Sequence, residues 1–163
     1  MDAEIPLGRG RALSPDELRR LLEEPICAFV ATLQADGSPY VSPLWHEYRD
    51  GVFVLISKPR AALCQNLRRD PRVTLAIAAP QPPYRRLFAQ GRAQEVGEDW
   101  IPTAERMVLR YVGREGLKYL EATRALPRVV FHVRPERTTS WNGGGIDRSF
   151  FQGSRWNEVG GAI

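Results

Sequence analysis

The sequence predicts a mainly β protein, a small antiparallel β-barrel of six to seven strands with flanking helices. Short apolar or alternating segments recur along the chain, and turn signals at Asp36-Gly37 and Asp50-Gly51 separate the first three of them. One helical segment is inserted midway along this run of strands. Tight antiparallel strands with a single inserted helix indicate a small sheet that closes on itself around one core.

Composition and charge favour one globular domain. The chain has 163 residues, of which 43% are hydrophobic and 26% charged. The net charge of +4 favours acidic ligands but is too small to require nucleic acid. The sequence shows no secretory signal and no apolar run of about 20 residues, so we expect a cytoplasmic protein with no membrane segment. Cys27 and Cys64 are expected to be reduced thiols, because no C-x-x-C spacing pairs them.

The first predicted element is a helix over residues 14–24. Ser14 can cap its N-terminus, Pro15 suits the first helical position, and Glu17 completes an S-x-x-E capping box. Pro25 ends the segment, because proline disfavours helical backbone in the residue before it.

Three strands come next, at 26–33, 39–48 and 51–57, and we expect them to form an antiparallel meander. The first is nearly all apolar, which indicates burial on both faces. Pro43 interrupts the second strand and lacks a backbone N–H, so a bulge or an unpaired backbone group is expected there. Unpaired backbone groups inside a sheet can bond a flat heterocycle.

The second half of the chain alternates helices and strands. Gly91 marks a bend or bulge in one strand, and Gly113 splits a helical region into two helices. The barrel domain is expected to span residues 1–142. Residues 143–163 form a Gly-rich tail with large aromatic side chains, which we expect to dock on the barrel or on a partner subunit. The predicted elements are a helix at 60–69, strands at 72–79 and 85–96, helices at 99–112 and 115–124, and a strand at 126–141.

The most informative segment joins the third strand to the next helix. Ser57, Lys58 and Arg60 follow the apolar strand directly, and a hydroxyl, two cations and a helix start are a combination that holds phosphate. A solvated basic surface is the alternative for these three residues. For the later cations of the segment a solvated helix face is the better interpretation. Those later cations are Arg68, Arg69 and Arg72.

Several motifs in this order resemble one known family. A DG hairpin, G-S-P-Y-V-S-P-L-W, a second DG turn, F-V-L-I-S, the basic junction and N-L-R-R-D-P-R-V resemble the pyridoxamine 5′-phosphate oxidase-like flavin-binding split barrels, over roughly residues 14–141. The resemblance is greatest to small members that use FMN or a deazaflavin coenzyme. It implies an antiparallel split barrel, a homodimer with flavin sites at the subunit interface, and an oxidoreductase that transfers hydride to or from a small conjugated substrate.

The resemblance also implies where the cofactor lies. The phosphate would be held at the end of the third strand and the start of the following helix, and the flat ring would lie along 42–45. The family usually has a lysine where this chain has Leu63. Tyr84, Arg86 and Trp141 are the candidates for side chains contributed by the second subunit. The full set of expected cofactor-binding residues is Ser42, Pro43, Leu44, Trp45, Ile56, Ser57, Lys58, Arg60, Leu63 and Trp141.

The sequence also contains candidates for other sites and functions. Trp45 either stacks on the ring or packs in the core, and on strand alternation His46 faces away from it. No side chain stands out as catalytic, and two lone histidines do not predict a zinc site. A non-catalytic flavin- or haem-binding protein for storage or sensing stays open, with His46 or His132 as an axial haem ligand. RNA binding is disfavoured, because the arginines cluster at a junction and do not interleave with surface aromatics.

Overall fold

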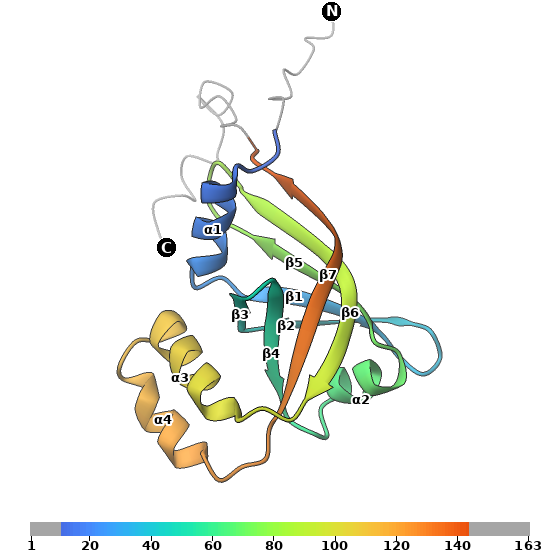
Figure 1. Ribbon diagram of the computed structural model, residues 1–163, viewed down its shortest axis with the longest axis vertical. Coiled ribbons are helices and arrows are strands. Elements are labelled where there is room, and N and C mark those ends of the chain that lie inside the picture. The colour runs from blue at the N-terminus through green and yellow to red at the C-terminus, as the bar shows by residue number, and fades with distance from the viewer. Residues whose placement is uncertain (1–10, 144–163) are drawn as a thin grey trace, which may run out of the picture.

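Seven antiparallel strands form a sheet that curls into a half-barrel in the computed structural model, which describes residues 11–143 (Figure 1). The order across the sheet is β2-β1-β5-β6-β7-β4-β3. The predicted mainly β split barrel is confirmed, while the predicted tail lies, apart from its first residue, outside the described residues. The elements are α1 (Pro15–Glu23), β1 (Ala28–Leu33), β2 (Pro39–Leu44), β3 (His46–Arg49), β4 (Val52–Ser57), α2 (Ala62–Arg69), β5 (Arg72–Ala78), β6 (Arg86–Val96), α3 (Trp100–Tyr111), α4 (Gly116–Thr123) and β7 (Val129–Trp141).

The strand predicted at 39–48 is two strands in the structure, separated at Trp45. β2 pairs with β1, where Leu44 lies opposite Ala28, and β3 pairs with β4, where His46 lies opposite Leu55. Each half therefore makes the pairing expected of a meander, but the halves lie at opposite edges of the sheet. The expected interruption falls at Trp45 and not at Pro43, because an edge strand tolerates a proline whose missing N–H has no strand to bond.

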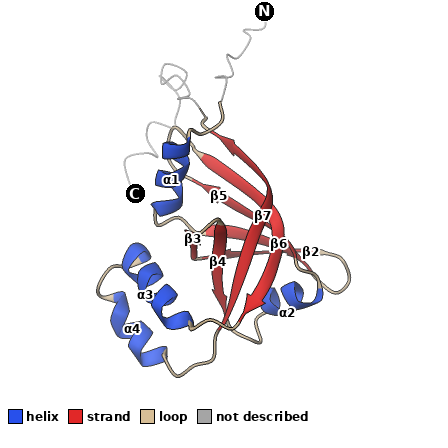
Figure 2. Ribbon diagram, in the orientation of Figure 1, coloured by secondary structure: helices blue, strands red, loops and turns tan. Residues whose placement is uncertain are grey.

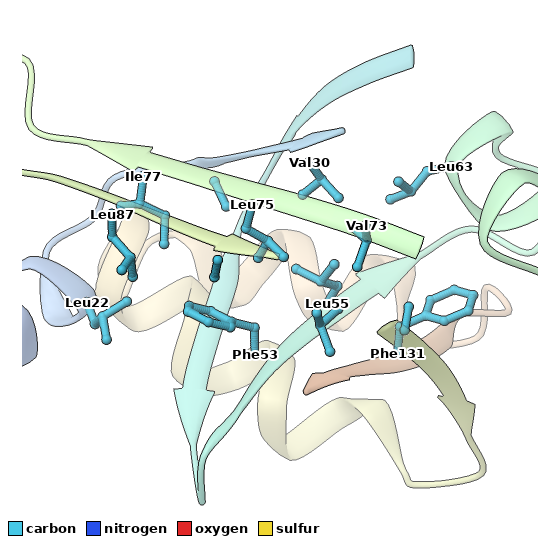
Figure 3. Close-up of a cluster of buried hydrophobic side chains, with 14 of the residues drawn as sticks. Leu22, Val30, Phe53, Leu55, Leu63, Val73, Leu75, Ile77, Leu87 and Phe131 are labelled. Atoms are coloured by element: carbon cyan, nitrogen blue, oxygen red, sulfur yellow. The ribbon is translucent and has the colours of Figure 1, made fainter. Parts of the chain in front are cut away.

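The core lies on the inner side of the curled sheet, and Figure 3 shows its side chains meeting from several strands. Phe53, Leu55 and Phe131 of neighbouring strands are at most 1% exposed. Helix α1 adds Leu22 and helix α2 adds Leu63 to the same cluster. Alternation in the strands divides inner from outer positions, so residues next to these face outward.

Helices α3 and α4 form a pair at one end of the sheet, apart from α1 and α2 (Figure 2). Asp99 caps α3 by accepting a hydrogen bond from the backbone N–H of Ile101 at 3.1 Å. Ala104, Val108 and Leu120 bury the seam between the two helices, and Ile56 of β4 packs against them. None of the helices in the described part of the chain is long and apolar enough to cross a membrane.

The capping box predicted for α1 is confirmed. The backbone N–H of Glu17 donates to Ser14 Oγ at 3.3 Å, and the N–H of Ser14 donates to Glu17 Oε2 at 2.8 Å. We expect Ser14→Ala to lower the free energy of unfolding by about 1 kcal/mol, because the helix loses its side-chain acceptor. Urea unfolding at pH 7 measures this change, and Ser14→Asn should restore most of it. An alanine variant as stable as the original chain would contradict the capping role.

Candidate functional site

An apolar pocket of about 420 Å³ lies between the helix pair α3–α4 and strands β2 and β4. Its size is within the range of small-ligand and cofactor sites. Arg128 is the one charged side chain that lines it within residues 11–143. The lining residues are Cys27, Pro43, Leu44, Trp45, Ile56, Trp100, Ala104, Met107, Val108, Tyr119, Leu120, Thr123 and Arg128.

Trp45 forms one wall of the pocket and is held by Tyr111, the last residue of α3. Their rings stack with centroids 4.9 Å apart and planes 8° from parallel. The Tyr111 hydroxyl donates to the carbonyl oxygen of Ile26 at 2.8 Å and lies 3.0 Å from Nδ1 of His46. Because that hydroxyl has only one proton, its oxygen accepts from His46 Nδ1–H. The indole plane of Trp45 is thereby fixed before any ligand binds.

His46 lies on the core side of the sheet, as alternation from Trp45 predicts. It is completely buried, with its ring 6.0 Å from that of Phe53. Burial, with a further contribution from the positive charge of Arg110, lowers the pKa of His46 to about 3, so the imidazole is neutral at pH 7. His46 does not line the pocket, and its Nδ1 is engaged by Tyr111. It is therefore badly placed to act as a ligand to haem bound there.

His132 is also engaged by a neighbour, on a different part of the sheet. Its Nε2 lies 3.0 Å from Oε2 of Glu98, whose other oxygen accepts from Arg49 at 2.6 Å. Like His46, it does not line the apolar pocket. Each of the two histidines therefore has one ring nitrogen engaged by a neighbouring side chain.

The basic segment divides into paired and unpaired cations. Arg68 forms a two-pronged ion pair with Glu95 at 2.7 and 2.8 Å, and Arg72 pairs with Asp70 at 2.6 Å. Arg69 donates to the carbonyl oxygen of Leu33. These contacts agree with the interpretation of the later cations as a charged surface. Within residues 11–143, Lys58 and Arg60 are exposed and make no side-chain ion pair or hydrogen bond.

Helix α2 begins directly after these two cations. Its N-cap residue is Ala61, which has no side chain to accept from the first backbone N–H groups. The two unpaired cations therefore lie beside the uncapped start of a helix, where an anion is stabilised by both.

The side chains of Ser57 and Leu63 are not on the side of β4 that lines the pocket, so they are not placed to bind a phosphate there. Ser57 is 7% exposed and, by alternation, faces away from the side of β4 on which Ile56 lines the pocket. Its hydroxyl donates to the carbonyl oxygen of Lys58 at 3.4 Å. Leu63 is 3% exposed in the core, so this position provides no charge. The sequence prediction therefore groups residues that the structure divides between the pocket side and the core side.

Arg128 also lines the pocket, although no motif in the sequence indicates it. In the register of β4 with β7, Ser57 lies opposite Val129. Lys58 directly follows β4 and Arg128 directly precedes β7, so these two residues are adjacent across the ends of the two strands. The guanidinium carbon of Arg128 lies 5.7 Å from the centre of the Trp100 ring, and its Nη1 donates to the carbonyl oxygen of Pro127 at 3.0 Å. The segment L-P-R-V-V shows only the start of a strand, and the pairing register that brings Arg128 to Lys58 is not visible in one sequence.

Of the residues expected to reach a partner's site, Arg86 and Trp141 lie on the outer face of the sheet, because the next residue of β6, Leu87, faces the core. Arg86 pairs with Trp141 across β6 and β7, and its guanidinium carbon lies 4.0 Å from the centre of that indole. Tyr84 is 41% exposed just before β6. None of these three lines the apolar pocket of its own chain. Ser42 of β2 also lies outside the lining.

Comparisons with known proteins agree with this fold. Residues 14–142 match the family model described as Pyridoxamine 5′-phosphate oxidase. A conserved hypothetical protein, Rv2991, from Mycobacterium tuberculosis is 26% identical, with a TM-score of 0.66 over 80% of this chain and 86% of that chain. An F420 reductase is 23% identical, with a TM-score of 0.60 over 74% of this chain and 94% of that chain. A FAD-binding protein from Mesorhizobium loti is 21% identical, with a TM-score of 0.60 over 81% of this chain and 96% of that chain. No curated protein matches the sequence.

Proposed function

Because the chain belongs to the pyridoxamine 5′-phosphate oxidase family, we propose that it is an oxidoreductase that uses FMN or a deazaflavin coenzyme and acts on a small conjugated substrate. The observation that carries this proposal is the apolar pocket, in which four of the expected cofactor-binding residues lie together. These are Pro43, Leu44, Trp45 and Ile56. The similar folds of an F420 reductase and a FAD-binding protein support a cofactor of this chemical class.

The residues present fit the ring of such a cofactor. The lining is almost wholly apolar, and the Trp45 indole offers a fixed flat surface for offset stacking. β2 is an edge strand of the sheet, so one side of its backbone has no strand partner within residues 11–143 and can bond the polar edge of the ring. Ser42 would take part through this backbone edge.

Only some of the residues expected to bind the cofactor phosphate are placed to contact it. Lys58 and Arg60, with the uncapped start of α2, remain the proposed phosphate contacts. Leu63 and Ser57 are buried, so neither provides a charge for the phosphate. A cofactor with a single phosphate needs only a few charge-assisted hydrogen bonds, which two cations and free backbone N–H groups can supply.

When bound, a flavin or deazaflavin supplies hydride transfer at its ring. The residues of this chain bind and orient it. Trp45 stacks on the ring, the backbone of β2 fixes its edge, and helices α3 and α4 exclude water from one side. No carboxylate lines the pocket in the described part of the chain, in keeping with a protein whose role is positioning.

The homodimer is part of the proposal, and the outer face of the sheet supports it. Phe29 and Phe88 are 50% and 43% exposed, and the register joins them in one row through Ala76. The row continues from Phe29 to Pro43, which lines the pocket. A second copy seated on this apolar face would therefore border the pocket. Trp141, Arg86 and Tyr84 are the proposed contributions to the partner's site.

Titration of the purified protein with FMN and with a deazaflavin tests this function. We expect micromolar or tighter binding of at least one, seen as a shifted visible spectrum and quenched tryptophan fluorescence. Trp45→Ala should weaken that binding by roughly tenfold, because a stacked aromatic pair is worth about 1 kcal/mol or more. Val112→Ala, at the exposed end of α3 outside the lining, should leave it unchanged.

Failure to bind either cofactor would end the proposal. Binding without reduction of the bound ring by any pyridine nucleotide or substrate would favour the storage or sensing alternative. A Soret band on addition of haem, lost in a histidine variant, would identify the haem-binding form of that alternative.

A further inference from the structure

Arg128 lies in an apolar wall and has no carboxylate partner among residues 11–143. It is half-buried, and its one hydrogen bond within residues 11–143 goes to the carbonyl oxygen of the preceding residue, Pro127. Its other guanidinium N–H groups have no acceptor in the described part of the chain and can donate to a ligand. Several other arginines are neutralised by carboxylates, such as Arg68 by Glu95 and Arg49 by Glu98. A cation held unpaired against apolar side chains creates a strong preference for an anion at that point.

A second cation lies beside it. Ser57 is opposite Val129 in the register of β4 with β7, so Lys58 and Arg128 extend from adjacent strand ends. Lys58 is exposed and makes no ion pair among the described residues. Adjacent like charges repel each other, and an anion between them removes that repulsion.

The lining of the pocket combines two kinds of chemistry. Trp45 contributes a flat apolar surface, and Arg128 contributes a positive charge. A guanidinium is a planar fork of donors that matches the two oxygens of a carboxylate or phosphate. A ligand that satisfies both is a flat conjugated ring that carries one such anionic group.

We infer that Arg128, assisted by Lys58, is the anion-recognising residue of this pocket, so that the charged group of its ligand lies between the ends of β4 and β7. This deepens and rests on the proposed function, because the anion belongs either to the cofactor or to the substrate. The shared chemistry is a phosphate or carboxylate on a flat ring.

Two matched pairs of probes test this inference. FMN is compared with riboflavin, which lacks the phosphate, and 2-naphthoate is compared with 2-naphthamide, which lacks the charge. Binding is measured by calorimetry and by quenching of the pocket tryptophans. The original chain is expected to bind the anionic member of at least one pair about tenfold to a hundredfold more tightly, the range expected of hydrogen bonds to charged groups.

Variants assign this preference to a residue. In Arg128→Gln, the affinities for the anionic and the neutral probe of a pair should differ by no more than about threefold. Arg128→Lys should retain part of the preference for the anionic probe, and Lys58→Gln should lower that preference less than Arg128→Gln does. Arg124→Gln is the matched control, because Arg124 lies on the neighbouring helix end, pairs with Glu121 and does not line the pocket. Thermal unfolding of each variant shows that it is folded.

The outcomes show whether the anion belongs to the cofactor or to the substrate. They also distinguish failure of the flavin function from failure of the anion site. A preference for FMN that Arg128→Gln abolishes assigns Arg128 to the cofactor phosphate, and a naphthoate preference that it abolishes assigns Arg128 to the substrate. If no flavin binds while the naphthoate preference depends on Arg128, the flavin function fails and the anion site stands. An anion preference that persists in Arg128→Gln, or no anion preference in the original chain, overturns the inference.

Discussion

Replacing Gly91 with alanine is expected to lower the free energy of unfolding by about 3 kcal/mol or more, or to prevent folding. A Cβ atom at this position would lie 2.0 Å from the backbone oxygen of Arg134 on β7. The backbone cannot readily move away, because β6 and β7 are paired on both sides of the register shift between Gln90 and Gly91. Only glycine allows so close an approach of two strands.

Gly97→Ala is the matched control for this change. A Cβ atom at Gly97 has no neighbour within 4 Å among the described residues, so this variant should be as stable as the original chain or slightly more stable. Urea unfolding followed by far-UV circular dichroism compares the two variants. Equal stability of the two alanine variants would show that the strands separate at Gly91 at little cost.

Lowering the pH from 7 to 5 is expected to remove about 2 kcal/mol of stability through His46 alone. Its pKa is lowered to about 3 in the folded protein and is near its ordinary value of 6.5 in the unfolded chain. Between these values the unfolded state binds a proton that the folded state does not bind. The free energy of unfolding therefore falls as the pH falls, by up to about 1.4 kcal/mol per pH unit below pH 6.5.

Urea unfolding at half-unit intervals between pH 7 and 5 measures this dependence. His46→Gln should flatten it, whatever its effect on absolute stability, while replacing the chain's other histidine with His132→Gln should leave the His46 contribution in place. The pKa of Asp70 is lowered to about 2 by its hydrogen bond from Arg72, so the loss of its stabilising charge occurs at lower pH than this window. A slope unchanged by His46→Gln would contradict the burial argument.

Local signals in the sequence predicted much of the fold. The capping box of α1, which Ser14 and Glu17 form, acts within one turn of helix. The turns at Gly37 and Gly51 depend on positive φ values of 83° and 79°, which the Asp-Gly pairs make accessible. Gly91 marked the bulge correctly, because glycine inside a strand indicates a close approach of backbones.

Features set by pairing between distant segments were not visible in the sequence. The break at Trp45 depends on which neighbour each half of the segment pairs with, and both halves look like strand. Arg128 joins Lys58 only through the register of β4 with β7. The orientation of Ser57, by contrast, could be predicted from the sequence, because side chains alternate along a strand and Ser57 follows Ile56 directly.

The corner at Trp45 limits how the length of this chain can vary. Insertions at the turns near Gly37 or Gly51 lengthen a loop and leave both strand registers intact. One residue added or removed between β2 and β3 would keep β2 in place and shift β3 by one position. Such a shift would turn His46 toward solvent and bring a charged neighbour, Glu47, toward the core. Natural variants of this protein should therefore differ in turn length and retain the spacing of the corner.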